Sequence, residues 1–403
     1  CHGTALPSLC MKTVELIYFN AGGGHRAAAL ALQQAMLDSP WRVRLVNLVD
    51  MIDPQALFHK TTGVQPEDVY NRRLSSGFTI GLTQELKVLQ FLIRLGHNAL
   101  TRKLRSYWIR TQPDLVVSLI PNFNRSLCQS VSSALPGVPF VTVLTDMADH
   151  PPSFWIEPDQ PQHVVCGTEH AARQALAAGC APQRIHRTSG MIIHPSFYAT
   201  STVNRVAERR AVGLDTDQAV GVVLFGGLGS DAMKSIATKL PDTPLILMCG
   251  HNAALAHALR STKNTAPRIV VEFTQDVAYW MRLADFFIGK PGPASLSEAV
   301  HLGLPVIVTR NAWTMPQERW NTEWVVDNGL GIVLRNFRHV RAGADAIVGD
   351  LPHWQSRVRA MHNQAVFEVP QILAKLLDQT RPCGPRADQM SGEGLKPFFP
   401  DPC

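Results

Sequence analysis

One stretch limits the possible folds more than any other, Phe286 to Val308, with the sequence FFIGKPGPASLSEAVHLGLPVIV. It contains a short apolar run, a turn at Lys290–Pro293, a helical pattern over Ala294–Leu302 and a second apolar run over Pro305–Val308. The order strand, loop, helix, strand is typical of the parallel βαβ unit. We therefore expect an α/β fold with a doubly wound parallel sheet.

The turn and the helix start of this unit are candidate ligand contacts. Ligands of such sheets lie at the carboxyl ends of the strands, and a helix N-terminus favours an anion. Glu298 lies one turn into the helix, where it either reaches a hydroxyl-bearing ligand or only complements the helix dipole. The candidate contacts of this unit are Gly292, Pro293, Ser295 and Glu298.

Length and composition narrow the class of protein. The 403 residues suit two domains, or three at most, and 45% hydrophobic and 17% charged residues argue against disorder. A net charge of +6 and a pI near 9.0 fall short of a nucleic-acid-binding profile but permit attraction to an anionic membrane surface or substrate. The 8 cysteines form no CxxC pair, so we expect reduced thiols in a cytosolic protein and no metal site. No apolar run reaches the length of about 18 residues of a membrane span.

The chain begins its first βαβ pattern after Met11-Lys12, so we expect residues 1–10 to be an extension. Val14–Asn20 is a predicted strand, a glycine-rich turn leads to His25, and Trp41–Val49 is a second strand that ends at Asp50. Gly22-x-Gly24-x-x-Ala27 with Asp50 formally fits the dinucleotide fingerprint. An NAD-dependent dehydrogenase is therefore one hypothesis, although such a match alone has little specificity.

The glycine-rich turn also supplies candidate catalytic and acceptor contacts, Gly23, Gly24 and His25. The positive end of a helix dipole lowers the pKa of a histidine, and a neutral imidazole can accept a proton. The alternative is that His25 is an N-terminal helix residue that faces water. Asp146, at the end of the predicted strand Val138–Leu144, is either a functional group at the carboxyl edge or the cap of the next turn.

A basic segment lies between these motifs. Leu82–Arg110 is helical in pattern, is interrupted near Gly96, and combines six cations with Leu, Phe, Tyr and Trp. A basic amphipathic helix with aromatic residues can dock on a membrane surface. An ordinary surface helix with its apolar face packed inward explains the pattern equally well.

The second half repeats the glycine-rich arrangement. The predicted strand Ala219–Phe225 is followed by a turn that suits a phosphate, through its backbone N–H groups and a hydroxyl: Gly226, Gly227, Gly229 and Ser230. Two further predicted strands end next to Asn252 and at Phe273. Two such halves indicate two facing Rossmann-like domains with a ligand between them, over residues 11–190 and 191–367. Residues 381–403 carry five prolines without periodicity, and we interpret them as a tail.

Five motifs in this order resemble the monogalactosyldiacylglycerol synthases and, more distantly, the GlcNAc transferase of lipid II synthesis: FNAGGGHRAAALAL, VTVLTDMADHPPSFW, LFGGLGS, LMCGHN and KPGPASLSEAVHLGLPVIVTRNAWTMPQERWN. Both are inverting GT-B glycosyltransferases that use UDP-sugars. The resemblance implies an N-terminal acceptor domain, a C-terminal UDP-sugar domain and a helix within 368–380 that crosses back to the first domain. The family's usual KAGPGT is KPGPAS here, and the sugar-facing loop carries the bulky Trp313 and Met315.

The resemblance also implies roles for single residues. His25 is similar to the acceptor-side histidine of the GGGH turn, a candidate base, and Asp146 to the aspartate of the TD motif. Gly226 to Ser230 match the diphosphate loop, and Glu298 matches the carboxylate that holds the ribose diol. Gln317 and Glu318 match the pair that reads the hydroxyls of the donor sugar.

The resemblance predicts an inverting enzyme that moves galactose or glucose from a UDP-sugar to a lipid such as diacylglycerol, without a metal or other cofactor. Its expected place is the cytoplasm, peripheral at the inner face of the cell membrane, with no nucleic-acid partner. Two alternatives stay open. One is a UDP-sugar 2-epimerase on the same fold, and the other is a non-catalytic protein that binds sugar nucleotides or lipids.

Overall fold

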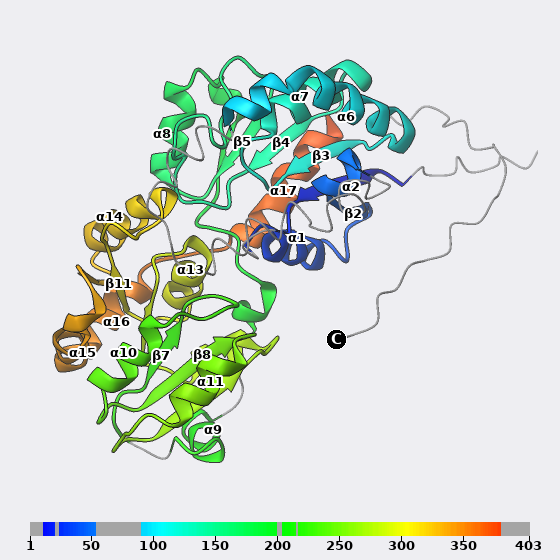
Figure 1. Ribbon diagram of the computed structural model, residues 1–403. Coiled ribbons are helices and arrows are strands. Elements are labelled where there is room, and N and C mark those ends of the chain that lie inside the picture. Colours follow the sequence, from blue (N-terminus) through cyan, green and yellow to red (C-terminus); the bar gives the residue numbers. More distant parts are fainter. Residues whose placement is uncertain (1–10, 21–23, 54–89, 200–203, 215–216, 380–403) are drawn as a thin grey trace, which may run out of the picture.

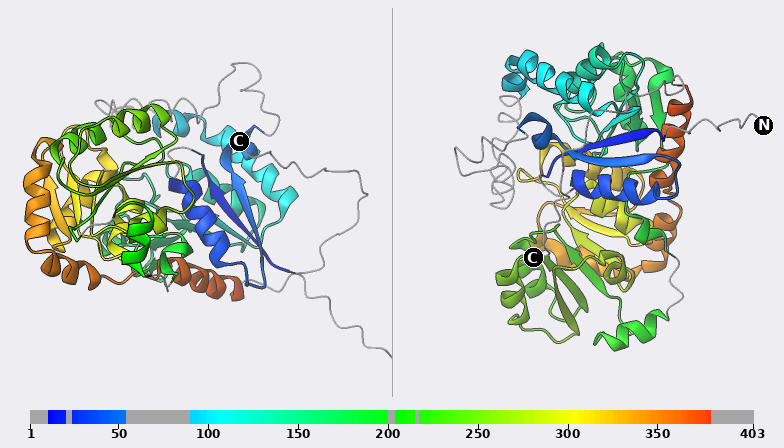
Figure 2. Two further views of the ribbon diagram at one scale, coloured as in Figure 1. Left: turned by 90° about the horizontal axis from the view of Figure 1, so that it is seen from below. Right: turned by 90° about the vertical axis from the view of Figure 1, so that its right-hand side faces the viewer.

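The computed structural model describes residues 11–20, 24–53, 90–199, 204–214 and 217–379. Two lobes lie one above the other in Figure 1, and each contains one six-stranded parallel sheet with helices on its faces. Two further views also show helices packed beside the strands of both sheets (Figure 2). The predicted α/β fold with two Rossmann-like domains is confirmed.

The first sheet has the strand order β2-β1-β3-β4-β5-β6. Its inner strands are mostly apolar and buried because helices cover both faces of the sheet, whereas the edge strands carry Arg42, Arg44 and Arg187. The strands are β1 (Thr13–Tyr18), β2 (Arg42–Asn47), β3 (Leu115–Ser118), β4 (Phe140–Val143), β5 (His163–Cys166) and β6 (Ile185–Arg187). The described helices of this domain include α1 (Gly24–Ala35), α2 (Leu48–Ile52), α6 (His97–Thr111), α7 (Asn124–Ala134) and α8 (Glu169–Ala177), and η1 (Pro182–Arg184) and η2 (Pro195–Tyr198) are 3-10 turns.

The second sheet has the order β12-β11-β10-β7-β8-β9. Its strands are β7 (Gly221–Leu224), β8 (Leu245–Gly250), β9 (Arg268–Glu272), β10 (Phe286–Gly289), β11 (Val306–Thr309) and β12 (Gly331–Leu334). The helices around it are α9 (Arg205–Ala211), α10 (Ala232–Lys239), α11 (Ala253–Arg260), α12 (Val277–Arg282), α13 (Pro293–His301), α14 (Arg319–Asp327), α15 (Val340–Gly349) and α16 (Leu351–Arg359), with the 3-10 turns η3 (Pro316–Glu318) and η4 (Phe337–His339).

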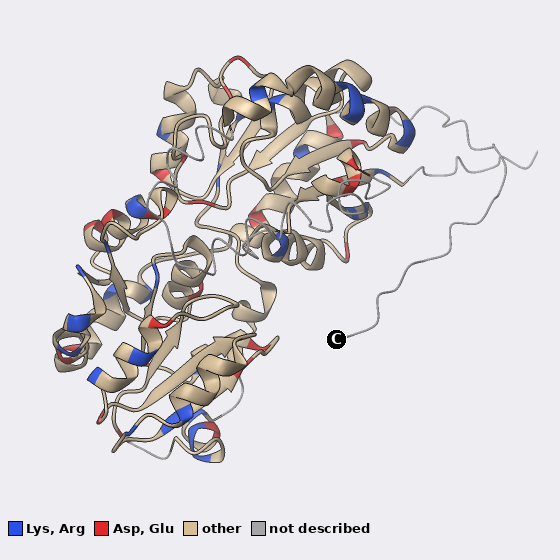
Figure 3. Ribbon diagram, viewed as in Figure 1, with Lys and Arg blue, Asp and Glu red and all other residues tan. Residues whose placement is uncertain are grey.

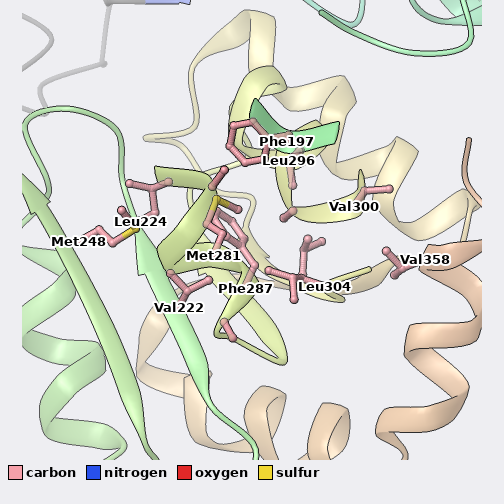
Figure 4. Close-up of a cluster of buried hydrophobic side chains, with 14 of the residues drawn as sticks. Phe197, Val222, Leu224, Met248, Met281, Phe287, Leu296, Val300, Leu304 and Val358 are labelled. Atoms are coloured by element: carbon pink, nitrogen blue, oxygen red, sulfur yellow. The ribbon is translucent and has the colours of Figure 1, made fainter. Parts of the chain in front are cut away.

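The predicted βαβ unit is β10, α13 and β11 at the centre of the second sheet. Figure 4 shows the core beneath it, where Phe287 of β10, Leu296 of α13 and Val222 of β7 pack together. All three side chains are fully buried. Burying such a side chain contributes about 1.5–3 kcal/mol, so these contacts hold the turn between β10 and α13 in place.

The last described helix, α17 (Ala365–Asp378), packs against α1 of the first domain. Its orange ribbon lies in the upper lobe in Figure 1. Val369 and Leu373 are fully buried there among residues of the first core, and Lys12 Nζ donates to the carbonyl of Leu377 at 2.5 Å. The C-terminal helix thus ties the end of the second domain to the first.

One sequence-based expectation is wrong, and one helix was not predicted. Asp50 does not end a strand, because β2 stops at Asn47 and Asp50 lies inside α2, whose first turn is capped by the Asn47 side chain. The acidic position required by the dinucleotide fingerprint is therefore missing. The helix α15 was not predicted, because its sequence VRAGADAIVG contains two glycines, which are weak helix formers. The predicted extension and tail, and residues 82–89 of the basic segment, lie outside the described residues.

Candidate active site

Each sheet has one topological switch point, where strand order reverses and a crevice forms. In the first sheet it lies between β1 and β3, and the helix that follows β1 begins with Gly24 and His25. In the second sheet it lies between β7 and β10, which lead into Gly226–Ser230 and Lys290–Pro293. The sequence motifs of both halves therefore stand at the positions where α/β sheets bind ligands.

His25 is a neutral, oriented imidazole. Its Nδ1 lies 3.2 Å from the Thr145 hydroxyl, and its ring centroid lies 5.8 Å from that of Trp155. Burial lowers the pKa of His25 to about 4, against a smaller upward effect of a hydrogen bond to the Leu119 carbonyl. The imidazole is therefore uncharged near neutral pH, and the strands β3 and β4 fix its position.

Asp146 follows β4 and lies beside His25 in the same crevice. The indole Nε1 of the fully buried Trp155 donates to its Oδ2 at 2.9 Å. Burial raises the pKa of Asp146 to about 7, opposed by this hydrogen bond and by Lys290, while Glu318 adds to the rise. The carboxyl group thus changes charge near neutral pH.

The loop that carries Trp155 is held by another carboxylate. Asp149 accepts backbone hydrogen bonds from Ser153, Phe154 and Trp155 at 3.1, 3.1 and 2.7 Å. These bonds replace regular secondary structure between β4 and β5 and point the Trp155 indole at Asp146. Sequence reasoning placed Asp146 but missed Trp155, although the tryptophan stands only nine positions further along the chain.

Lys290 and Glu318 approach this group from the second domain. Lys290 Nζ lies 3.1 Å from Glu318 Oε1, and Glu318 is the main cause of the raised pKa of Lys290. The neighbouring Gln317 is 8% exposed, and its Oε1 has no hydrogen-bond partner among the described residues. A buried amide oxygen without a partner is costly, so Gln317 is poised to accept from a ligand hydroxyl.

Glu298 lies in α13 without a counter-charge. Burial alone raises its pKa to about 7, and its side chain makes no hydrogen bond or ion pair within the described part of the chain. Gly292 and Pro293 form the start of this helix, and the Ser295 hydroxyl donates to the Gly292 carbonyl at 3.3 Å. A Cβ at Gly292 would lie 3.5 Å from Glu318 Oε1, so the turn and the second carboxylate are close neighbours.

The other glycine-rich turn shows why these positions are glycines. Gly226 and Gly229 have φ values of 84° and 60°, which β-carbons disfavour. The Gly229 amide donates to the Gly226 carbonyl at 3.1 Å, and Gly227 has open space beside its Cα. Ser230 accepts a hydrogen bond at 3.2 Å from the amide of Ala232, the first residue of α10. The result is an exposed backbone that an anion can approach.

Two predicted contacts lie at the ends of β8 and β9. Asn252 caps α11, because its Oδ1 accepts from the Leu255 amide at 2.9 Å while its Nδ2 donates to the Leu228 carbonyl at 3.2 Å. It therefore supports the glycine-rich turn. Phe273 is 55% exposed and stacks on His251 with ring centroids 3.9 Å apart. The stacked rings form a flat surface at the edge of the sheet. Sequence analysis did not single out His251.

Of the two predicted glycine contacts before His25, the structure describes one. Gly24 is the first residue of α1, with open space beside it, and Gly23 lies outside the described residues. Among the described residues no group of three or more His, Cys, Asp or Glu side chains is placed to hold a metal ion. Four cysteines, Cys128, Cys166, Cys180 and Cys249, are buried free thiols.

The sequence is related to known proteins over most of its length. A probable monogalactosyldiacylglycerol synthase 2 of Oryza sativa subsp. indica is 28% identical over 410 residues, which cover 91% of this chain and 81% of the relative. Monogalactosyldiacylglycerol synthase 3 of Arabidopsis thaliana is 26% identical over 359 residues, which cover 81% and 72%. This chain is similar to the monogalactosyldiacylglycerol synthases. The resemblance read from the motifs is thus confirmed, and it supports glycosyltransferase activity. No family model matches the chain.

Solved structures confirm the fold. MurG of Acinetobacter baumannii superposes with a TM-score of 0.55 at 13% identity and covers 91% of this chain and 100% of its own. The calicheamicin glycosyltransferase CalG4 superposes with a TM-score of 0.57 at 15% identity over 91% and 98%. The fold is GT-B. At these identities the likeness concerns the fold alone.

Proposed function

We propose that the protein is an inverting glycosyltransferase that moves galactose or glucose from a UDP-sugar to the hydroxyl of a lipid such as diacylglycerol. One observation carries this proposal. Polar side chains of the two domains lie close together in the cleft. His25, Trp155 and Asp146 come from the first domain, and Lys290 and Glu318 come from the second. A reaction between two substrates requires that the groups which bind each substrate lie next to each other.

The second domain supplies the donor site in this proposal. Backbone N–H groups at Gly226–Ser230 and at the start of α13 bind the diphosphate. Glu298, which has no described partner, accepts from the ribose hydroxyls, and Gln317 and Glu318 accept from the sugar. The exposed ring stack of Phe273 and His251 offers a flat face to the base. Asn252 supports the glycine-rich turn through the Leu228 carbonyl.

The first domain supplies the proton acceptor, for which two groups compete. A base works best when its pKa lies near the working pH. Protonating His25, with a pKa of about 4, near neutral pH costs roughly 4 kcal/mol, since each pH unit is worth about 1.4 kcal/mol. Asp146, with a pKa of about 7, carries almost no such cost. We therefore propose that Asp146 is the base that accepts the proton, and that His25 orients the acceptor hydroxyl.

The step itself is one displacement. The acceptor oxygen forms a bond to the anomeric carbon, the bond from that carbon to the β-phosphate oxygen breaks, and Asp146 takes the hydroxyl proton. UDP leaves with its electron pair, and its negative charge is stabilised by the backbone amides of Gly226–Ser230 and of the start of α13. Attack from the face opposite to the leaving group inverts the anomeric configuration.

The basic segment offers a way to reach a lipid acceptor. On its described part, Phe91, Leu92 and Leu95 are 59%, 56% and 68% exposed, and the exposed cations Arg102, Lys103 and Arg105 follow on α6. In Figure 3 the ribbon of this region is blue at its Lys and Arg positions, at the upper right. Among the described residues no helix is long and apolar enough to cross a bilayer. We propose peripheral docking of this face on anionic lipid at the inner side of the cell membrane.

The decisive test pairs UDP-galactose, UDP-glucose and UDP-N-acetylglucosamine with diacylglycerol and with total membrane lipid, and identifies the products by mass spectrometry. We expect a hexosyl lipid whose anomeric proton, by NMR, shows inversion. A sugar nucleotide that is isomerised without any acceptor would instead identify a 2-epimerase. Binding of UDP without any product would identify a non-catalytic binding protein.

A further inference from the structure

A cavity of about 370 Å³ lies between the domains, apart from the groups described above. Its walls come from the ends of β5 and β6 and the start of α8 in the first domain, from α13 and α14 in the second, and from residues 361–363, which lead into α17. His170 of α8 stacks on Trp320 of α14 across the domain boundary, with ring centroids 4.4 Å apart and planes 15° apart. Neither His25, Asp146 nor Glu298 lines this cavity.

The cavity has the composition of a small-molecule site. Such sites occur at domain interfaces, have volumes of about 300–1,000 Å³, and combine an apolar lining with few polar groups. Here the apolar part consists of Met147, Met191, Val300, Trp320, Trp324 and Met361. A ligand with a compact apolar body can therefore bury that body between the two tryptophans and the methionines.

One polar group in the wall has no protein partner. Ser297 is only 6% exposed, lines the cavity, and its hydroxyl makes no hydrogen bond within the described part of the chain. The oxygen itself is accessible from the cavity, where a water or a ligand can form a hydrogen bond with it. The neighbouring residues Leu296 and Val300 pack into the core, so α13 holds the Ser297 hydroxyl in a fixed place.

The charge of the wall favours an anion. Two arginines, Arg173 and Arg187, line the cavity, and Glu169 is the one acidic residue among its described lining residues. Glu169 is already paired with Arg187. Arg173 makes no ion pair with any described residue, and burial lowers the pKa of the adjacent His170, which keeps that ring uncharged. One guanidinium is thus left to meet a negative group.

We propose that this interdomain cavity is a second ligand site, separate from the donor site, which takes a small amphipathic anion. The apolar body lies between Trp320 and Trp324, and a carboxylate, sulfonate or phosphate group meets Arg173 and Ser297.

The site is placed to act on the active site. Three of its wall residues are close in sequence to proposed active-site residues: Met147 follows Asp146, Ser297 precedes Glu298, and Trp320 comes two residues after Glu318. A ligand that touches both domains also favours one relative position of the two. Where UDP also binds one of these positions more tightly, the two ligands change each other's affinity by the same factor.

The test uses the full chain and two probes with the same ring system, the anion 8-anilinonaphthalene-1-sulfonate and the uncharged N-phenyl-1-naphthylamine. We expect the anion to bind at least about tenfold more tightly, because hydrogen bonds to a charged group are strong. Arg173→Gln should abolish this difference and leave the uncharged probe unaffected. Ser297→Ala should weaken binding of the anion by about two- to tenfold, and Trp324→Ala should weaken binding of both probes.

Arg338→Gln is the matched control, since it removes an exposed arginine of η4 in the second domain that does not line the cavity. Thermal melts check that every variant is folded. Anion binding that is the same in all variants, or that saturating UDP displaces competitively, overturns the proposal. The readout is binding rather than turnover, so a failure here is distinct from a failure of the proposed glycosyl transfer.

Discussion

The two domains build their halves of the cleft in different ways. In the second domain most of the proposed ligand-binding groups come from strand–turn–helix units that are continuous in sequence, such as Phe286–His301 around Lys290 and Glu298. In the first domain the groups meet through contacts between distant segments. His25 and Thr145 are 120 positions apart, and Trp155 reaches Asp146 through a loop that Asp149 fixes.

This difference fits a division of labour. Binding a diphosphate and a ribose needs backbone amides and a carboxylate in a standard geometry, which a single βαβ unit supplies. Taking a proton at the right moment needs a carboxyl group whose pKa is adjusted by several neighbours. Changes in the first domain should therefore affect turnover, and changes in the second should affect donor affinity.

The largest expected effect is on Asp146. If it accepts the proton, Asp146→Asn should lower kcat by about a hundred- to ten-thousandfold, while UDP affinity by calorimetry stays close to that of the parent. His25→Ala should lower kcat less, because its imidazole orients rather than accepts. A greater loss in His25→Ala than in Asp146→Asn would reverse the two roles. A loss of UDP affinity in Asp146→Asn would contradict the division between the domains.

The next effect concerns how the first domain meets its lipid. Each cation near an anionic surface contributes about 1 kcal/mol, so replacing Arg102, Lys103 and Arg105 by Gln should weaken binding to anionic vesicles by roughly a hundredfold. Sedimentation with vesicles at low and high salt measures this. Arg209 is not a suitable control, because it pairs with Asp285. Arg357→Gln, on α16, removes a cation of the other domain and should leave vesicle binding unchanged.

The sequence predicts the second-domain half of the cleft better than the first, because its contacts are mostly local in sequence. The turns at Gly226 and Lys290 were predicted because each lies between its own strand and helix, and hydrophobic periodicity marks both. Gln317 and Glu318 were placed by resemblance, and the structure adds that one is buried without a partner and the other paired with Lys290. No local pattern encodes that pairing across 28 positions.

The first half shows where the sequence is insufficient. The contact of Trp155 with Asp146 depends on backbone bonds to Asp149, and the pKa of His25 depends on the burial of its imidazole in the folded chain. The sequence predicted a neutral His25 from the helix dipole, whereas in the structure burial is what lowers its pKa. Asp50 illustrates the opposite failure, because the motif was present but Asn47 caps a helix there.

The third prediction examines the second domain. Glu298→Ala removes charge-assisted hydrogen bonds to the ribose, worth roughly 1.5–3 kcal/mol, so UDP affinity should fall by about ten- to a hundredfold. Glu298→Gln keeps the shape and one acceptor, so its loss should be smaller. Calorimetry with UDP measures both variants. Equal UDP affinity in parent and Glu298→Ala would show that Glu298 only complements the dipole of α13.

The smallest effect is the pH dependence of turnover, and it separates the two first-domain groups most sharply. Burial raises the pKa of Asp146 to about 7 and lowers that of His25 to about 4. A base must be unprotonated, so kcat should fall by about tenfold per pH unit below the pKa of whichever group accepts the proton. With Asp146 as the base, this fall begins near pH 7. With His25 as the base, kcat stays level until about pH 4.

The measurement has to isolate the first domain. Glu298 also has a pKa of about 7, so loss of its charge weakens donor binding in the same pH range. Saturating UDP-sugar at every pH removes that contribution from kcat and leaves it in kcat/KM. Trp155→Phe sharpens the result, because the indole N–H that lowers the pKa of Asp146 is lost. The fall of kcat at acid pH should then begin at a higher pH. A fall that begins at the same pH as in the parent would show that another group causes it.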